Sequence, residues 1–195
     1  MSIFRRRPTI QAPPDLEPGE RVVASAPTAD GGVLAVTNHR LVVEGEHPLR
    51  VAWHLVDGGG WRPEGDELWA SFVDGTEPGA WVLPEPGSVP MAFRERVQGS
   101  VVLTEHVVID RVNAARVVLR KDPRDSRLSV QTIFRQGADP ELPPLRQGIA
   151  DAVARLAEHV AWSADPVFVR HALLAMVAQR CGAIPCSSIG RAADC

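Results

Sequence analysis

The stretch Leu34-Ala-Val-Thr-Asn-His-Arg-Leu-Val-Val43 consists of two apolar segments on either side of a short polar one. Apolar and β-branched residues favour extended strands, and Asn38 tolerates the left-handed backbone conformation that a tight turn requires. The stretch therefore predicts an antiparallel hairpin, with strands at residues 33–37 and 40–44 and a turn at Asn38 and His39.

Short strands separated by turn signals continue on both sides of this hairpin. We expect strands at residues 20–26, 50–56, 68–73 and 80–83. The three glycines at residues 58–60 predict a flexible hairpin, and Pro84 and Pro86 end the series because proline lacks the N–H that strand pairing needs. From Ser88 to about Leu103 apolar residues recur every three or four positions, which predicts an amphipathic helix packed on the sheet.

The order of about seven short strands and one helix, together with the hairpin stretch, resembles the bacterial pleckstrin-homology-like (PH-like) domains. In that family a Thr-Asn-x-Arg turn joins two strands of this kind, and Pro18-Gly-Glu-Arg-Val-Val23 resembles the family's opening. The resemblance covers residues 18–104. It implies a small antiparallel sheet or barrel capped by a helix, and a scaffold that makes protein or lipid contacts.

A second sheet-like series follows, with a turn at residues 121–126 and a linker at residues 136–144. We expect its strands at residues 104–109, 115–120 and 127–134. A stripe of apolar residues from Leu145 to Val160 predicts a long amphipathic helix that ends at about Trp162. The expected fold class is therefore α+β, in which a PH-like sheet is followed by a three-stranded sheet with a long helix.

These patterns divide the chain into five segments. They are a flexible arm containing Arg and Pro at residues 1–17, the PH-like domain at 18–104, a small α+β segment at 105–163, a short helical extension at 164–183, and a disordered incidental tail at 184–195. The tail, Ile184-Pro-Cys-Ser-Ser-Ile-Gly-Arg-Ala-Ala-Asp-Cys195, resembles the conceptual translation of an asparagine-type transfer-RNA gene. Its codons can spell the D-arm and the start of the anticodon loop, followed by a stop, so we interpret it as read-through without a role in folding.

Composition indicates an ordinary globular protein, with 45% hydrophobic residues, 23% charged residues and a formal net charge of -3. Twenty of the 21 basic residues are Arg and Tyr is absent, which is typical of a GC-rich, actinobacterial-type genome. We see no apolar run of signal-peptide or membrane-helix length and therefore expect a soluble, cytoplasmic protein. The three cysteines lie near the end of the chain and predict neither a disulfide framework nor a metal site.

Charge is distributed unevenly along the chain. Residues 18–87 contain eleven acidic and four basic residues, whereas residues 88–140 contain nine basic and six acidic ones. An acidic surface repels polyanions, so we do not expect the first domain to bind phosphoinositides or nucleic acid. The basic residues of the second part could form a rim around one hairpin, although a charged edge that prevents aggregation is the simpler interpretation.

The sequence contains no recognisable catalytic, cofactor-binding or metal-binding motif, because its six histidines are scattered and its triple glycine lacks a following Lys-Ser or Lys-Thr. We therefore expect no enzyme and no cofactor, but a non-catalytic module that binds an unidentified protein partner. Candidate contact residues are Trp61, Arg116, Arg120, Lys121 and Arg124. Two alternatives stay open: a nucleic-acid-associated protein that uses the basic hairpin at residues 111–135, and an enzyme whose site the sequence does not reveal. The oligomeric state is also left open.

Overall fold

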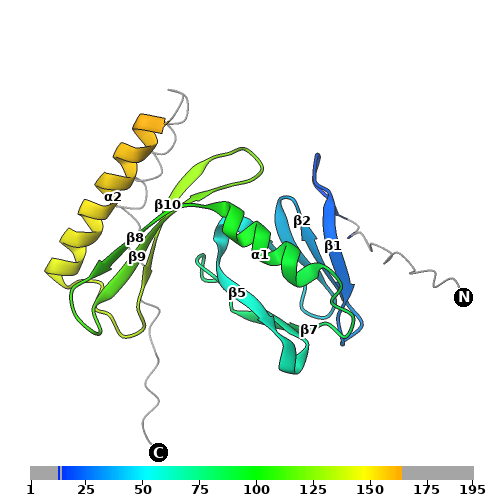
Figure 1. The fold of residues 1–195 in the computed structure, drawn as a ribbon. Coiled ribbons are helices and arrows are strands. Elements are labelled where there is room, and N and C mark those ends of the chain that lie inside the picture. The colour runs from blue at the N-terminus through cyan, green and yellow to red at the C-terminus, as the bar shows by residue number, and fades with distance from the viewer. Residues whose placement is uncertain (1–12, 14, 164–195) are drawn as a thin grey trace, which may run out of the picture.

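Three antiparallel sheets and two α-helices make up the part of the chain that the structure, a computed structural model, describes: residue 13 and residues 15–163 (Figure 1). The predicted α+β class, including a long last helix, is confirmed. Within this part the strands form separate sheets of four, three and three strands, so the barrel that the resemblance allowed is not closed. The segments predicted at residues 164–183 and 184–195 lie outside the described residues.

The first sheet contains the hairpin that the sequence predicts. Its strands pair in the order β1 (Val22–Pro27), β2 (Val33–Thr37), β3 (Arg40–Glu44) and β4 (Leu49–Ala52). Asn38 does not adopt the left-handed conformation expected for this turn. Among the described residues other than glycine, positive φ occurs only at Asp66 and Ser126. Thr37 Oγ holds the turn instead, by accepting hydrogen bonds from the N–H groups of His39 and Arg40 at 3.1 and 2.9 Å.

The second sheet corrects two sequence predictions. It follows a short 3-10 turn, η1 (Trp53–Leu55), and consists of β5 (Val56–Arg62), β6 (Glu67–Phe72) and β7 (Gly79–Val82). The strand predicted at residues 50–56 is therefore divided by η1. The glycines at residues 58–60, predicted as a hairpin, lie inside β5, and the chain turns instead at η2 (Pro63–Gly65), where Asp66 adopts a left-handed conformation with φ 46°.

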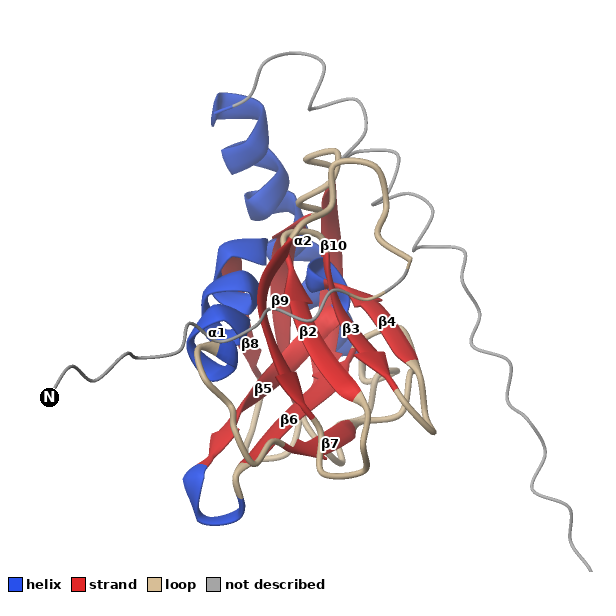
Figure 2. Ribbon diagram, turned by 90° about the vertical axis from the view of Figure 1, so that its right-hand side faces the viewer, coloured by secondary structure: helices blue, strands red, loops and turns tan. Residues whose placement is uncertain are grey.

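Helix α1 (Val89–Ser100) explains why glycine occupies the middle of β5. The helix lies beside the strands of the first two sheets (Figure 2). A Cβ atom on Gly59 would lie 2.6 Å from both Phe93 Cζ and the backbone oxygen of Trp69. Trp53 meets the same Phe93 ring edge to face at 5.9 Å between centroids, and both side chains are buried in the first hydrophobic core.

The third sheet begins directly after α1, so the helix ends at Ser100 rather than at the predicted Leu103. Its strands are β8 (Val101–Val108), β9 (Ala114–Lys121) and β10 (Leu128–Phe134), in the order β10-β9-β8. Helix α2 (Pro143–Ser163) covers one face of this sheet, where it buries Leu145, Ala152 and Leu156 in a second core (Figure 1). The first two sheets with α1, here called the first unit, and the third sheet with α2, the second unit, therefore have separate cores.

We expect Gly59→Ala to destabilise the protein by about 1–3 kcal/mol, because the added methyl group must displace the Phe93 ring or the backbone of Trp69. Gly60→Ala is the matched control, since the nearest atom to a Cβ at that position lies 3.5 Å away, at an ordinary contact distance. Urea denaturation measures both free energies of unfolding. Equal stability of the two variants would contradict this account of the packing.

Candidate functional site

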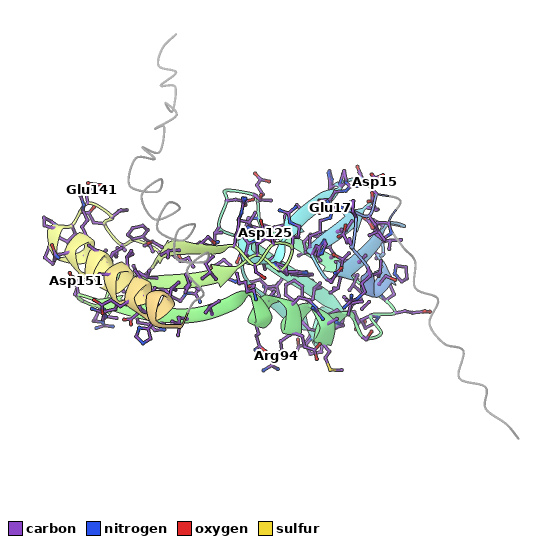
Figure 3. The ribbon with its side chains drawn as sticks, turned by 90° about the horizontal axis from the view of Figure 1, so that it is seen from above. Asp15, Glu17, Arg94, Asp125, Glu141 and Asp151 are labelled. Carbon is purple, nitrogen blue, oxygen red and sulfur yellow. The ribbon has the colours of Figure 1, made fainter. Side chains whose placement is uncertain are left out.

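A groove of about 530 Å³ runs between β5 and α1 in the first unit. Its lining residues are Gly59, Gly60, Trp61, Pro90, Met91, Phe93, Arg94, Val97 and Gln98. Met91 is 65% exposed, an unusual exposure for a large apolar side chain. Arg94, which projects outward from α1 in Figure 3, is the one charged residue of the lining. The groove is therefore mainly apolar, with a single positive charge.

One wall of this groove is the free edge of β5, which pairs with β6 alone among the described strands. Leu83 donates its N–H to Asp66 O at 2.8 Å, beside the β6–β7 ladder. The backbone N–H and C=O groups of successive residues in a strand point alternately to its two sides. Since Asp66 bonds toward β7, the even-numbered residues of β6 bond to β7 and its odd-numbered residues bond to β5. The register then pairs these odd-numbered residues with the even-numbered residues of β5. Gly59 and Trp61 therefore direct their backbone N–H and C=O groups away from the sheet, toward the open side.

Two arginines of β9, in the second unit, bind the start of β5 in the first unit. A register shift between Val56 and Gly58 leaves Asp57 as a bulge in the strand. Arg120 donates a hydrogen bond of 3.1 Å to Asp57 O, and Arg116 makes an ion pair of 2.6 Å with the Asp57 carboxylate. These contacts fix the end of β5 that precedes the groove.

Arg120 is a buried charge, with only 1% of its surface exposed. Desolvation lowers its pKa from the ordinary value, and the nearby Asp57 carboxylate opposes this change. Its guanidinium also donates to Ser100 Oγ, the last residue of α1, at 2.9 Å. One side chain therefore connects β9, β5 and the end of α1.

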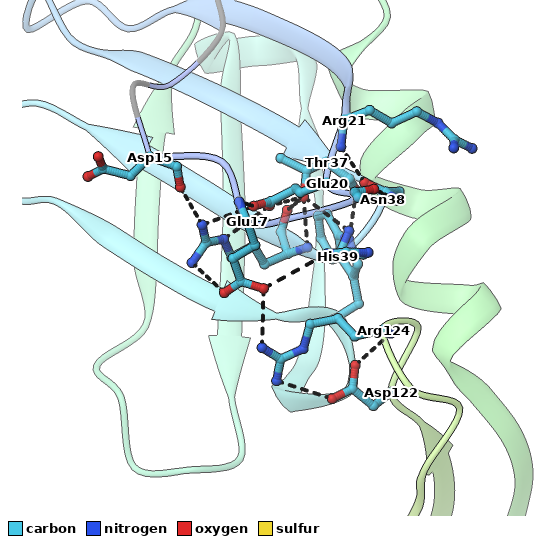
Figure 4. Close-up of polar contacts among 12 residues, drawn as sticks. Asp15, Glu17, Glu20, Arg21, Thr37, Asn38, His39, Asp122 and Arg124 are labelled. Carbon is cyan, nitrogen blue, oxygen red and sulfur yellow. Dashed lines mark hydrogen bonds and ion pairs between the residues drawn. The ribbon is translucent and has the colours of Figure 1, made fainter.

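A second polar network joins the two units through Glu17 and Arg124 (Figure 4). Arg40 pairs with Glu17 at 3.1 Å and with the buried Glu20 at 3.0 Å, while Arg124 pairs with Glu17 and with Asp122, both at 3.3 Å. Burial alone would raise the pKa of Glu20. The hydrogen bonds that this carboxylate accepts from the Glu17 N–H, Thr37 and Arg40 nevertheless hold its pKa below the ordinary value.

The same network brings three potential metal ligands together. Glu17, Glu20 and His39 offer ligand-type atoms within 4.8 Å of one another. The two carboxylates are already paired with Arg40 and Arg124, so their positions are explained by ion pairing between the units. We therefore assign the cluster a structural role.

The structure separates the five residues predicted as partner contacts. Trp61 lines the groove and packs partly against the first core rather than standing free. Arg120 is buried, Arg116 is paired with Asp57, and Arg124 is paired across the junction. Lys121 is exposed, beside a different pocket at the end of α1. The five residues therefore do not form one continuous surface.

The other residues of the groove were missed by sequence reasoning. Gly59 was interpreted as part of a flexible hairpin, and the helix that carries Met91 and Arg94 was assigned only a packing role. The available signal was a run of glycines next to Trp61 and followed by an amphipathic helix, because strand positions without side chains let a helix approach closely.

Comparison of the chain with protein-family models, with curated proteins and with solved structures gave no match. The resemblance to PH-like domains therefore stays a prediction. Among the helices of the described residues, none has the length and apolar character needed to cross a membrane.

We expect Arg120→Met to lower the free energy of unfolding by about 1–3 kcal/mol, because the Asp57 carbonyl and the Ser100 hydroxyl lose a buried donor. Arg127→Met is the matched control. It removes an exposed ion pair with Asp125 and should have a much smaller effect. Urea denaturation distinguishes the two variants, and equal losses of stability would contradict the role assigned to Arg120.

Stability should fall as pH is lowered below about 6.5, in part because of His54. Burial lowers the pKa of His54, against the opposing effect of Asp122, whose carboxylate lies 3.6 Å from the ring. Below the ordinary histidine pKa the unfolded state therefore binds more protons than the folded state, which favours unfolding. His54→Asn should reduce the difference in stability between pH 7.5 and pH 5.5, whereas His106→Asn, at an exposed position, should not. Denaturant titrations at both pH values test this, and identical differences in all three proteins would refute it.

Proposed function

We propose that this protein is a non-catalytic protein-binding module that takes an extended segment of its partner along β5. The observation that carries the proposal is the free edge of β5, with outward backbone groups at Gly59 and Trp61, beside an apolar groove. An open strand edge supplies hydrogen bonds to any extended peptide, and neighbouring side-chain pockets select its sequence.

The lining of the groove defines the chemistry of the partner segment. Side chains alternate along an extended peptide, so every second residue would point toward α1. Met91 and Trp61 favour apolar side chains at those positions, because methionine adapts its shape to different apolar groups. Arg94 favours one acidic residue in the segment. The partner is therefore a protein with an exposed, apolar and weakly acidic extended segment.

A PH-like identity of the first unit is part of this proposal. Its support is the resemblance of residues 18–104 together with the order of elements, in which sheets of four and three strands precede one packed helix. The cytoplasmic location expected from the sequence likewise stays a prediction.

We do not propose the two alternatives. Nucleic-acid binding by the hairpin at residues 111–135 needs a continuous basic surface, whereas Arg120 is buried and Arg116 and Arg124 are paired with acidic residues. For catalysis, the pocket at the end of α1 places Ser100 beside Glu95 and Lys121. The Ser100 hydroxyl donates to Val97 O at 2.7 Å and accepts from Arg120 at 2.9 Å, so its hydrogen bonds serve the junction between the units rather than activation by a base.

Selection of random peptides displayed on phage against the full chain tests the proposal. We expect enriched sequences with alternating apolar residues and an acidic residue. Met91→Glu should weaken binding of a selected peptide at least tenfold, because it places a charge in the apolar groove. Val82→Glu is the matched control, since Val82 is also an exposed apolar residue but lies outside the groove.

Arg94→Glu adds a second test of the same groove, because it should remove the preference for acidic residues. Peptide-induced shifts of the Gly59 and Trp61 amide resonances would locate the bound peptide. Selected peptides that bind Met91→Glu and Val82→Glu equally well, or a failure to enrich any peptide, would refute the proposal.

A further inference from the structure

A second and larger groove, of about 770 Å³, lies in the second unit between β10 and α2. Its lining is mainly apolar and includes Val130, Thr132 and Phe134 of β10 and Ile149, Ala150 and Val153 of α2. Phe134 is 38% exposed. The groove lies far from the first unit's β1 and β2, as the position of α2 in Figure 1 shows.

The open side of this groove is the free edge of β10, which pairs with β9 alone among the described strands. The N–H of Arg135 is donated to Ala114 O at 2.8 Å, so odd-numbered residues of this segment face β9. Alternation along the strand then directs the N–H and C=O groups of Val130, Thr132 and Phe134 outward.

This edge lacks the usual protection against pairing with another strand. The seven residues of β10, Leu-Ser-Val-Gln-Thr-Ile-Phe, contain no charge, no proline and no glycine. Exposed edge strands normally contain charged residues or proline, or are covered by another helix or loop. An added strand would extend the three-stranded sheet to four and would fill the space beneath α2.

We propose that the occupant of this groove is β10 of a second copy of the chain, paired antiparallel about a twofold axis at Thr132. Val130 would then lie opposite Phe134 of the partner subunit, so that each Phe134 enters the groove of the other copy. Val130, Thr132 and Phe134 would exchange about six backbone hydrogen bonds across the axis. The result is a continuous six-stranded sheet.

The charges that flank β10 select this register. An axis at Gln131 would place Arg127 directly opposite Arg135 of the partner subunit, which is unfavourable for like charges. The axis at Thr132 places Arg135 opposite Ser129 of the partner subunit instead. The opposite face of β10 is already engaged within the chain, where Gln131 donates a hydrogen bond of 2.6 Å to His54 O. The face of β10 that points toward α2 and the free edge of β10 are therefore the surfaces that the second copy would contact.

Site-specific cross-linking tests the axis. In the full chain, with Cys181, Cys186 and Cys195 replaced by Ser, Thr132→Cys should form a disulfide-linked dimer under mild oxidation, because residues at the axis face each other directly. Thr104→Cys is the matched control, since Thr104 is an exposed threonine on the other free edge of the same sheet, β8. It should stay uncross-linked.

Sedimentation velocity over a wide range of concentrations tests the dimer without cross-linking. We expect twice the chain mass of 21.1 kDa at high concentration, and a loss of the dimer in Phe134→Glu. Val108→Glu, at an exposed apolar position outside the groove, should keep it. Met91→Glu should also keep it, which separates this inference from the peptide site on β5. A monomer at all concentrations, equal cross-linking of the two cysteine variants, or a dimer that survives Phe134→Glu would overturn the inference.

Discussion

The buried guanidinium of Arg120 is the contact on which the arrangement of the two units depends. It satisfies the carbonyl that the β5 bulge leaves unpaired and the hydroxyl at the end of α1, while its own strand belongs to the third sheet. A buried charge without partners would be strongly unfavourable, so the units are stable together only in an arrangement that supplies those partners. Apolar packing stabilises each unit, and this polar contact specifies how they meet.

The contribution of the bulge at Asp57 follows from the same contact. A bulge bends a strand and disrupts its ladder, which would weaken β5 at the point where the chain leaves η1. Arg120 and Arg116 bind the bulged residue, and the strand beyond it pairs regularly with β6, with Gly59 against α1 and its outer edge open. The second unit thus supports the groove without lining it.

Local sequence patterns correctly predicted the helices and strands whose formation is determined by residues close together in the chain. The hairpin at residues 33–44 and the long last helix follow from apolar periodicity, and both are confirmed. The position of the turn at Asn38 was predicted correctly, but the predicted left-handed conformation was wrong. The turn is held instead by the Thr37 hydroxyl oxygen, which accepts hydrogen bonds from two backbone N–H groups. The glycines of β5 were misread for a different reason: glycine is typical of turns, and only the approach of Phe93 from a distant helix explains it in a strand.

The candidate sites could be predicted only in part, because both are relationships between elements. Trp61 was recognised as a candidate contact residue from its position beside the glycines. The burial of Arg120 was not predicted, because in the sequence it is a basic residue like the exposed Lys121 that follows it. Alternation along β9 directs one side chain into the junction and its neighbour to solvent, and no local signal shows which side the first unit occupies. The free edges of β5 and β10 likewise become visible only when the strand order is known.

The absence of a loop between α1 and β8 has a mechanical consequence. Helix and strand meet at Ser100 and Val101, so a rotation of the helix axis cannot be absorbed by a flexible connection and must move the start of β8. α1 forms one wall of the first groove, and β8 belongs to the sheet that carries the second. A change in the position of α1 in the first groove would therefore also shift the sheet that carries the second groove, at the point where Arg120 binds Ser100.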